Sequence, residues 1–131
     1  MIYADANILI RLLEGEPASR LPLESRLASC RGQAHSLATS TLSRLECRCK
    51  PLRMDDSATL TLYEAFFRSP EMFLLSITDE IIEKATELRA KWKFSTPDAI
   101  HLATAITADA RVFLTGDRQL RQCSEIVIEL I

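Results

Sequence analysis

The chain of 131 residues is poor in glycine and proline, with 3 and 5 residues respectively, and it contains no repeat or low-complexity tract. Disordered and fibrous proteins depend on such compositions, so both classes are excluded. No apolar run approaches the roughly 20 residues that span a bilayer, which argues against a membrane protein. Because 47% of the residues are hydrophobic, residues 1–131 are expected to form one globular domain with a substantial core.

A secretion signal and a disulfide framework are not expected in this sequence. The first residues contain no basic stretch and reach an acid at Asp5, unlike a signal peptide. The four cysteines lack the regular spacing of disulfide-stabilised domains: Cys30, Cys47, Cys49 and Cys123. We therefore expect reduced thiols and a cytoplasmic protein.

The sequence has no excess of positive charge, since 16 basic residues stand against 18 acidic ones and the formal net charge is −2. A protein that binds nucleic acid mainly through its overall field is expected to be basic, so the net charge does not support that mode. Twelve of the 16 basic residues are arginines, whose guanidinium groups suit bidentate contact with phosphate. A local basic strip is therefore compatible with the composition.

Short apolar segments typical of buried strands alternate with segments of helical periodicity. Strands are predicted at residues 2–4, 34–37, 72–75, 111–114 and 126–128, and helices at residues 7–13, 18–30, 42–49, 55–67, 78–92 and 96–108. This alternation predicts parallel strands that are covered on both faces, which is an α/β fold with a three-layer α/β/α sandwich.

Capping and helix-breaking residues set the expected boundaries. Residues 39–41 are rich in hydroxyls that suit the start of the third helix, and Pro51 is expected to end that helix. Thr96 is expected to cap the last helix, with Pro97 in its first turn. Ile82 belongs to the expected core-facing stripe of the helix at 78–92.

Two acids fall where a parallel α/β sheet binds its ligands, beyond the carboxyl ends of strands at the point where the strand order reverses, and two more are candidates for the same edge. Asp5 follows the first strand, and Asp117 lies just beyond the fourth. Asp98 lies in the first turn of the helix that leads to the fourth strand, and Glu46 borders the apolar face of the third helix. An acid beside a buried strand, such as Asp5, loses hydration and needs a compensating partner.

Three of these acids also have structural explanations. Asp98 at a helix N-terminus is favoured by the macrodipole by ~0.3–1 kcal/mol. Ser43 and Glu46 have the spacing of a capping box, and Asp117 suits a turn. If the four acids do converge, their repulsion requires a cation, and an oxygen-only ligand set favours Mg²⁺ or Mn²⁺ over zinc. Such a site can activate water against a phosphodiester.

Four segments, in order, resemble the motifs of the PIN domain family: IYADANILI at 2–10, LSRLE at 42–46, PDAIHLATA at 97–105 and FLTGD at 113–117. Together they span essentially the whole chain. Within the family, the chain most resembles the VapC toxins of toxin–antitoxin pairs. The resemblance implies a central parallel sheet of about five strands and a metal-dependent endoribonuclease that uses Mg²⁺ or Mn²⁺.

The resemblance also implies residue roles. It assigns four acids as both catalytic residues and metal ligands: Asp5, Glu46, Asp98 and Asp117. Asn7 and Thr115 match polar positions that hold the acids in place, and Ser43 is expected to support them as well. VapC-like proteins usually form homodimers, and a small antitoxin protein blocks their acidic cleft. An RNA substrate, an antitoxin and a second copy of the chain are therefore the expected partners.

Two departures from the family pattern change these expectations. Ala6 stands where many relatives carry a hydroxyl, so one supporting hydrogen bond is expected to be missing. No second acid follows Asp117, so one metal ion is expected rather than two. Arg118 and Arg121 follow instead, and they are interpreted either as contacts to RNA phosphate or as solvated surface residues.

Two other functions fit parts of the sequence. A phosphatase of the haloacid dehalogenase type also places an aspartate after its first strand, but it needs a second aspartate two residues further, where this chain has Asn7. A PIN-like module that only binds RNA or protein is the second alternative. Intact acids at four positions favour catalysis, because neutral residues in place of a repulsive cluster would stabilise the fold.

Two further groups of residues have open roles. His101 lies three positions after Asp98 on the same helical face, but its apolar neighbours favour a packed histidine over a metal ligand. Tyr63, Phe66 and Phe67 are interpreted as core or dimer contacts, and exposure of these rings would favour the dimer.

Overall fold

Five short parallel strands form one sheet at the centre of the structure, a computed structural model that describes residues 1–34 and 36–131. The strands are β1 (Ile2–Ala4), β2 (Leu37–Ser40), β3 (Met72–Leu75), β4 (Val112–Thr115) and β5 (Ile128–Leu130). Their order is β3-β2-β1-β4-β5, and every neighbouring pair is parallel. The predicted parallel sheet is confirmed.

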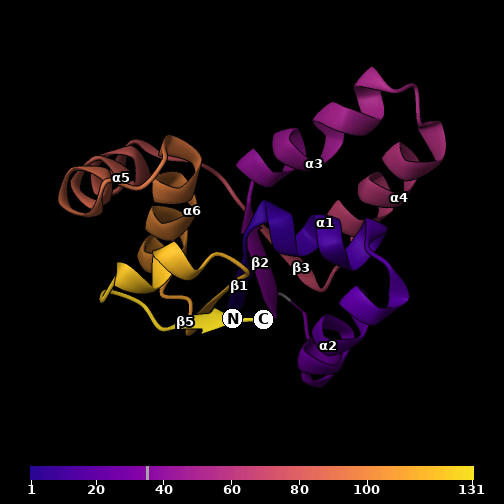
Figure 1. The fold of residues 1–131 in the computed structure, drawn as a ribbon, viewed down its shortest axis with the longest axis horizontal. Helices are drawn as coiled ribbons and strands as arrows, with labels where there is room; N and C mark the ends of the chain where they lie inside the picture. Colours follow the sequence, from indigo (N-terminus) through magenta and orange to yellow (C-terminus); the bar gives the residue numbers. More distant parts are fainter. Residues whose placement is uncertain (35) are drawn as a thin grey trace.

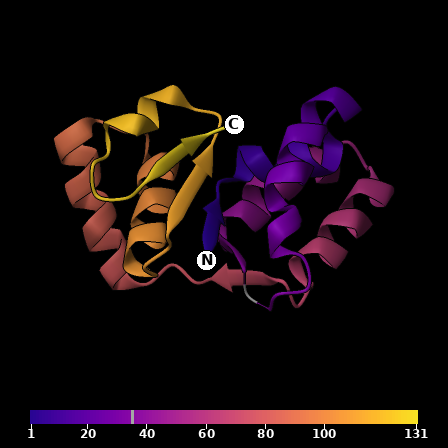
Figure 2. The same ribbon diagram turned by 90° about the horizontal axis from the view of Figure 1, so that it is seen from below.

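Helices cover both faces of this sheet, as Figures 1 and 2 show. One face carries α1 (Ala6–Glu14), α2 (Pro17–Leu27), α3 (Leu42–Arg53) and α4 (Ser57–Phe67). The other carries α5 (Asp79–Trp92) and α6 (Thr96–Thr107). Two 3₁₀ turns, η1 (Ala28–Cys30) and η2 (Arg118–Gln122), complete the described elements. The predicted three-layer α/β/α sandwich is confirmed.

The alternation of side chains along the strands divides the core in two. In β1, the side chain of Tyr3 packs with residues of α5 and α6, whereas Ile2 and Ala4 pack with residues of α1 to α4. In β4, Phe113 and Leu114 divide in the same way. Each large apolar side chain buried in this manner contributes about 1.5–3 kcal/mol. The sheet is therefore held from both sides.

The second strand, β2, begins at Leu37, three residues later than the predicted start at residue 34. The predicted range includes residue 35, which lies outside the described residues. Thr39 and Ser40, expected to cap a helix, are buried in β2 instead. Burial of Thr39 is tolerated because its hydroxyl donates to the Ala4 carbonyl at 2.8 Å. Thr41 is left as the N-cap of α3, with no side-chain hydrogen bond.

Three further boundary predictions and one burial prediction were wrong. Pro51 lies inside α3 near its C-terminal end, where its ring is buried although it removes one backbone hydrogen bond of the helix. Ser95, and not Thr96, caps α6 by accepting from the Asp98 amide at 3.3 Å. The last strand was predicted two residues too early, and Ile82 is 43% exposed rather than in the core.

Side chains that commonly cap helices begin two more of the helices, and the cysteines are reduced as expected. Thr78 accepts from the Ile81 amide at the start of α5, and Asp56 accepts from the Thr59 amide at the start of α4. The four cysteines are free thiols. Among residues 1–34 and 36–131, no helix combines the length and apolar character that crossing a bilayer requires.

Candidate active site

The strand order reverses between β1 and β4, which lie side by side in the sheet but far apart in the sequence. From β1 the chain builds the sheet outward through β2 and β3, and it then returns to add β4 and β5 on the other side. Asp5 directly follows β1, and Asp117 lies two residues beyond the end of β4. Both acids therefore lie at the carboxyl edge beside the reversal, where α/β sheets bind their ligands.

One hydroxyl joins the loops that carry these two acids. The Thr115 hydroxyl donates to Asp5 Oδ2 at 2.6 Å and accepts from the Asp117 amide at 3.1 Å. The other oxygen of Asp5 accepts from the Ile8 amide at 3.0 Å and caps α1. Asp5 is 6% exposed. Two hydrogen bonds therefore hold the Asp5 carboxylate, although the alanine at position 6 supplies no hydroxyl.

The pKa of Asp5 is raised above its ordinary value, mainly because the carboxyl is buried. The hydrogen bonds from Thr115 and Ile8 and the electrostatic interaction with His101 partly oppose this shift, and the negative charge of Asp98 adds to it. No cation among the described residues forms an ion pair with Asp5 or Asp98.

The raised pKa of Asp5 predicts a pH-dependent stability for the metal-free protein. Above the ordinary value of 3.8, the folded chain holds a proton that the unfolded chain has released, so the free energy of unfolding falls as the pH rises through the folded pKa. We expect urea midpoints measured in EDTA to fall from about pH 4 upward. Asp5→Asn cannot titrate and should remove this slope, whereas an unchanged slope in the variant would exclude Asp5 as its source.

Asp98 and Asp117 differ in how they are held. Asp98 lies half-buried in the first turn of α6, and its side chain has no hydrogen bond or ion pair in the described part of the chain. Asp117 caps η2, where its side chain accepts from the Gln119 amide at 2.9 Å. The structural interpretation of Asp117 as a turn residue is therefore correct, and it does not prevent a second role for the free oxygen.

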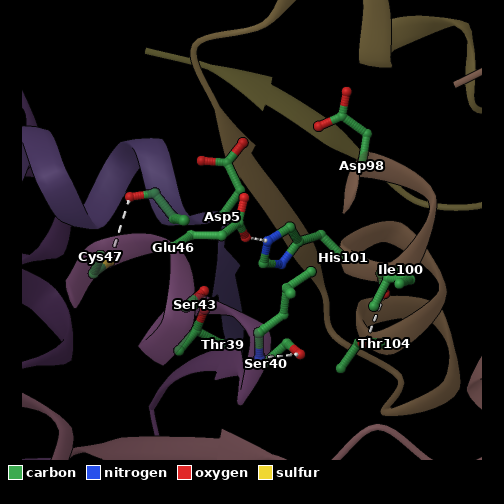
Figure 3. Close-up of polar contacts among 12 residues, drawn as sticks. Asp5, Thr39, Ser40, Ser43, Glu46, Cys47, Asp98, Ile100, His101 and Thr104 are labelled. Atoms are coloured by element: carbon green, nitrogen blue, oxygen red, sulfur yellow. Dashed lines mark hydrogen bonds and ion pairs between the residues drawn. The ribbon is translucent and has the colours of Figure 1, made fainter. Parts of the chain in front are cut away.

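Glu46 extends from α3 toward Asp5 and His101, whereas Asp98 lies apart from it, as Figure 3 shows. Its Oε1 lies 2.6 Å from Nε2 of His101, and Nδ1 of His101 lies 2.6 Å from the hydroxyl of Tyr3. The capping-box interpretation of Glu46 is wrong, because its carboxylate contacts an imidazole and not a backbone amide of α3. His101 is packed and 2% exposed, as predicted.

The polar contacts of Tyr3 and His101 were not predicted from the sequence. One signal was available: residues 3 and 5 point to the same side of an extended chain, so a phenol two residues before Asp5 approaches the same edge. The position of His101, three residues after Asp98, was a second signal. What could not be read from the sequence was that Glu46, on another helix, completes the chain of contacts.

The two other supporting residues do not contact the four acids. Asn7 is exposed, and its side chain forms no hydrogen bond with a described residue. The Ser43 hydroxyl lies 2.6 Å from that of Thr39. Because Thr39 donates its one proton to the Ala4 carbonyl, Ser43 donates to Thr39. Ser43 thus joins α3 to the sheet rather than holding a carboxylate.

The donor set fits a hard divalent cation, since the four carboxylates offer only oxygen ligands. Within the described residues, no group of three or more Asp, Glu, His or Cys side chains is arranged to hold a metal ion. The negative charge of Asp98 adds to the raised pKa of Asp5, and a bound cation would oppose that contribution.

Two surfaces border the acids. Arg118 and Arg121 are exposed on η2, directly after Asp117, and form no ion pair within residues 1–34 and 36–131. Between α3 and α4, a groove of about 920 Å³ is lined mostly by apolar and arginine side chains: Arg44, Leu45, Arg48, Cys49, Leu52, Leu60, Glu64, Phe67, Arg68 and Leu74.

Tyr63 is fully buried and so belongs to the core, whereas Phe66 and Phe67 are half-buried.

The five-stranded parallel sheet, with Asp5 and Asp117 after the strands beside its point of reversal, is the α/β architecture that the motifs predicted. The family model described as PIN domain matches residues 2–126. The chain belongs to the PIN domain family. Comparison with curated protein sequences finds no significant match.

Solved structures with the same fold come from toxin–antitoxin systems. A chain of DNA-bound VapBC from Salmonella typhimurium has a TM-score of 0.80 and 16% identity, covering 98% of this chain and 96% of that chain. A chain of promoter-bound VapBC2 from Rickettsia felis has a TM-score of 0.78 and 15% identity, with 99% and 98% covered. VapC20 from Mycobacterium tuberculosis, described as a toxin that cleaves the sarcin-ricin loop, has a TM-score of 0.72 and 17% identity, with 97% and 99% covered. These likenesses confirm the fold.

Proposed function

We propose that this protein is a metal-dependent endoribonuclease and the toxin of a VapBC-type toxin–antitoxin module. The observation that carries the proposal is the buried Asp5 carboxylate at the reversal point of the sheet, held by Thr115 and the Ile8 amide, with the charge of Asp98 adding to its raised pKa. Repulsion between like charges lowers the stability of the fold, so acids kept together at this edge favour a functional role. The cleavage activity of VapC20, which has the same fold, supports RNA as the substrate.

Mg²⁺ or Mn²⁺ would be held by Asp5 and Asp98, with Glu46 and Asp117 as the further ligands. When bound, such an ion supplies an activated water and stabilises the negative charge that develops on the phosphodiester. The chain's own residues prepare the ligands. Thr115 and the Ile8 amide hold Asp5 in one orientation, and the Thr115 hydroxyl ties the loop of Asp117 to the same carboxylate.

The direct test is cleavage of RNA by the purified protein with Mn²⁺ or Mg²⁺, compared with the same protein in EDTA. We expect cleavage that depends on the metal, with no covalent intermediate on the protein. Trapping of a phosphate on Asp5 would favour a phosphatase of the haloacid dehalogenase type instead. RNA binding without cleavage under either metal would favour a PIN-like module that only binds.

We further propose that Arg118 and Arg121 contact the RNA backbone at the mouth of the site. Reversing both charges in Arg118→Glu with Arg121→Glu should weaken RNA binding and lower the slope of log affinity against log salt by about 1.4, or about 0.7 for each lost phosphate contact. The matched control reverses Arg31 and Arg111, which are exposed near the amino ends of β2 and β4. Equal slopes for the two double variants would contradict the contact.

The proposed protein partner is an antitoxin that docks in the groove between α3 and α4. VapBC2 and the Salmonella VapBC, which share this fold, are described as VapBC assemblies bound to DNA. The groove presents exposed leucines, with Leu45 at 63% and Leu52 at 66%, beside arginines that form no ion pair with an acid outside the groove in the part of the chain that the structure describes. This chemistry fits an amphipathic helix with acidic residues along its edge. A homodimer, a single domain over residues 1–131 and a cytoplasmic location complete the proposal.

A further inference from the structure

A buried chain of three side chains joins three separate elements at the site. Tyr3 on β1 contacts Nδ1 of His101 on α6 at 2.6 Å, and Nε2 of His101 contacts Glu46 on α3 at 2.6 Å. The imidazole is fixed from all sides: its side chain is 3% exposed, and its ring packs edge-on against Tyr3, which in turn stacks on Phe113 with 5.2 Å between ring centroids. His101 therefore has one available orientation.

The contacts also assign the proton on His101. An unprotonated Nε2 facing a carboxylate oxygen would oppose two lone pairs, so Nε2 carries a proton and donates it to Glu46. In the neutral imidazole, Nδ1 is then an acceptor, and the Tyr3 hydroxyl donates to it. Tyr3 thus selects the form of His101 that can hold Glu46.

Glu46 needs such a partner because of its position. It is a long, rotatable side chain on a helix whose neighbouring residues Arg44 and Leu45 are exposed, and its own side chain is 29% exposed. The contact with His101 engages only Oε1, so Oε2 has no hydrogen-bond partner within residues 1–34 and 36–131. Figure 3 shows this carboxylate directed from α3 toward His101, beside Asp5.

We propose that His101 is a positioning residue of the nuclease site, which together with Tyr3 holds the Glu46 carboxylate so that its second oxygen is available to a divalent cation. This inference rests on the proposed function. Hydrogen-bonding partners of metal ligands typically change metal affinity or activity by 10–100-fold when they are removed. The apolar neighbours of His101 do not require a histidine, but the two hydrogen bonds do.

The test measures Mn²⁺ affinity of the purified full-length chain by calorimetric titration. His101→Leu keeps an apolar side chain of similar bulk but removes the donor, and we expect it to weaken Mn²⁺ binding by about 10–100-fold. His101→Gln restores an N–H donor near Nε2 and should recover part of this loss. In a Glu46→Gln background, His101→Leu should have no further effect, because the ligand that it positions is already gone.

Urea midpoints distinguish positioning from packing. A His101→Leu variant that is less stable but binds Mn²⁺ within about 2-fold of the parent would overturn the inference, as would an equal loss in the Glu46→Gln background. If His101→Leu does not fold, Tyr3→Phe, which keeps the ring on Phe113, decides in its place: weaker Mn²⁺ binding is expected, and unchanged binding overturns the inference.

Asp98→Asn separates this inference from the proposed function. If Asp98→Asn weakens Mn²⁺ binding and the variants of His101 and Tyr3 do not, only the positioning role fails. If Asp98→Asn leaves Mn²⁺ binding unchanged as well, the metal site itself is absent and the proposed function fails with it.

Discussion

Asp98→Asn is expected to lower metal-dependent RNA cleavage by about 10³-fold, the loss that corresponds to about 4 kcal/mol of transition-state stabilisation by a bound ion. Asp98 has no hydrogen bond or ion pair in the described part of the chain, so its carboxylate has no structural contact to lose. The measurement is a time course of RNA cleavage with Mn²⁺ for the parent and the variant, purified in the same way.

Asp79→Asn is the matched control. Asp79 also lies in the first turn of a helix, α5, but it is exposed. Both substitutions remove a favourable macrodipole interaction of about 0.3–1 kcal/mol, whereas only Asp98→Asn also relieves repulsion with Asp5. Without metal, Asp98→Asn should therefore cost less stability than Asp79→Asn. Equal cleavage by the parent and Asp98→Asn would mean a contaminating nuclease and would leave the binding-only module as the explanation.

The second large effect is expected at the groove between α3 and α4. Leu45→Glu combined with Leu52→Glu should weaken antitoxin binding by at least about 100-fold, because it places two charges on the apolar surface that we assign to the partner helix. The partner used is the protein encoded by the adjacent reading frame. Both leucines are more than half exposed, so the fold should be retained.

Leu62→Glu provides the control for this experiment. Leu62 lies on α4 and is 48% exposed, but it does not line the groove. The Leu62→Glu variant should leave antitoxin binding unchanged. Both this variant and the double variant should retain RNA cleavage, because none of the three leucines is hydrogen-bonded to a carboxylate of the site. Antitoxin binding that survives the paired substitution would place the partner on another surface.

The sheet could be predicted from the sequence because its strands are short, apolar and bounded by clear turn or capping residues. The exceptions have local physical causes. Thr39 and Ser40 resemble helix caps, and they lie in β2 because the Ala4 carbonyl and neighbouring hydroxyls satisfy Thr39 within the sheet. Pro51 resembles a helix end, and α3 continues past it because packing of the buried ring offsets the missing amide.

The candidate site could be predicted only in part. The positions of Asp5 and Asp117 follow from topology, since acids after the strands beside a reversal must lie at one edge. The contact of Glu46 with His101 depends on how α3 and α6 approach each other across the sheet edge, and no single segment of sequence carries that information. Asn7 shows the converse, because matching a family position did not give its side chain a hydrogen bond to a described acid.

Anomalous diffraction from crystals soaked in Mn²⁺ tests the central claim most directly, because it locates the cation without depending on activity. We predict one strong peak within coordination distance of both Asp5 and Asp98, which disappears in crystals of Asp98→Asn. Soaked crystals with no peak beside these two carboxylates, or with manganese bound only elsewhere on the protein, would contradict the account.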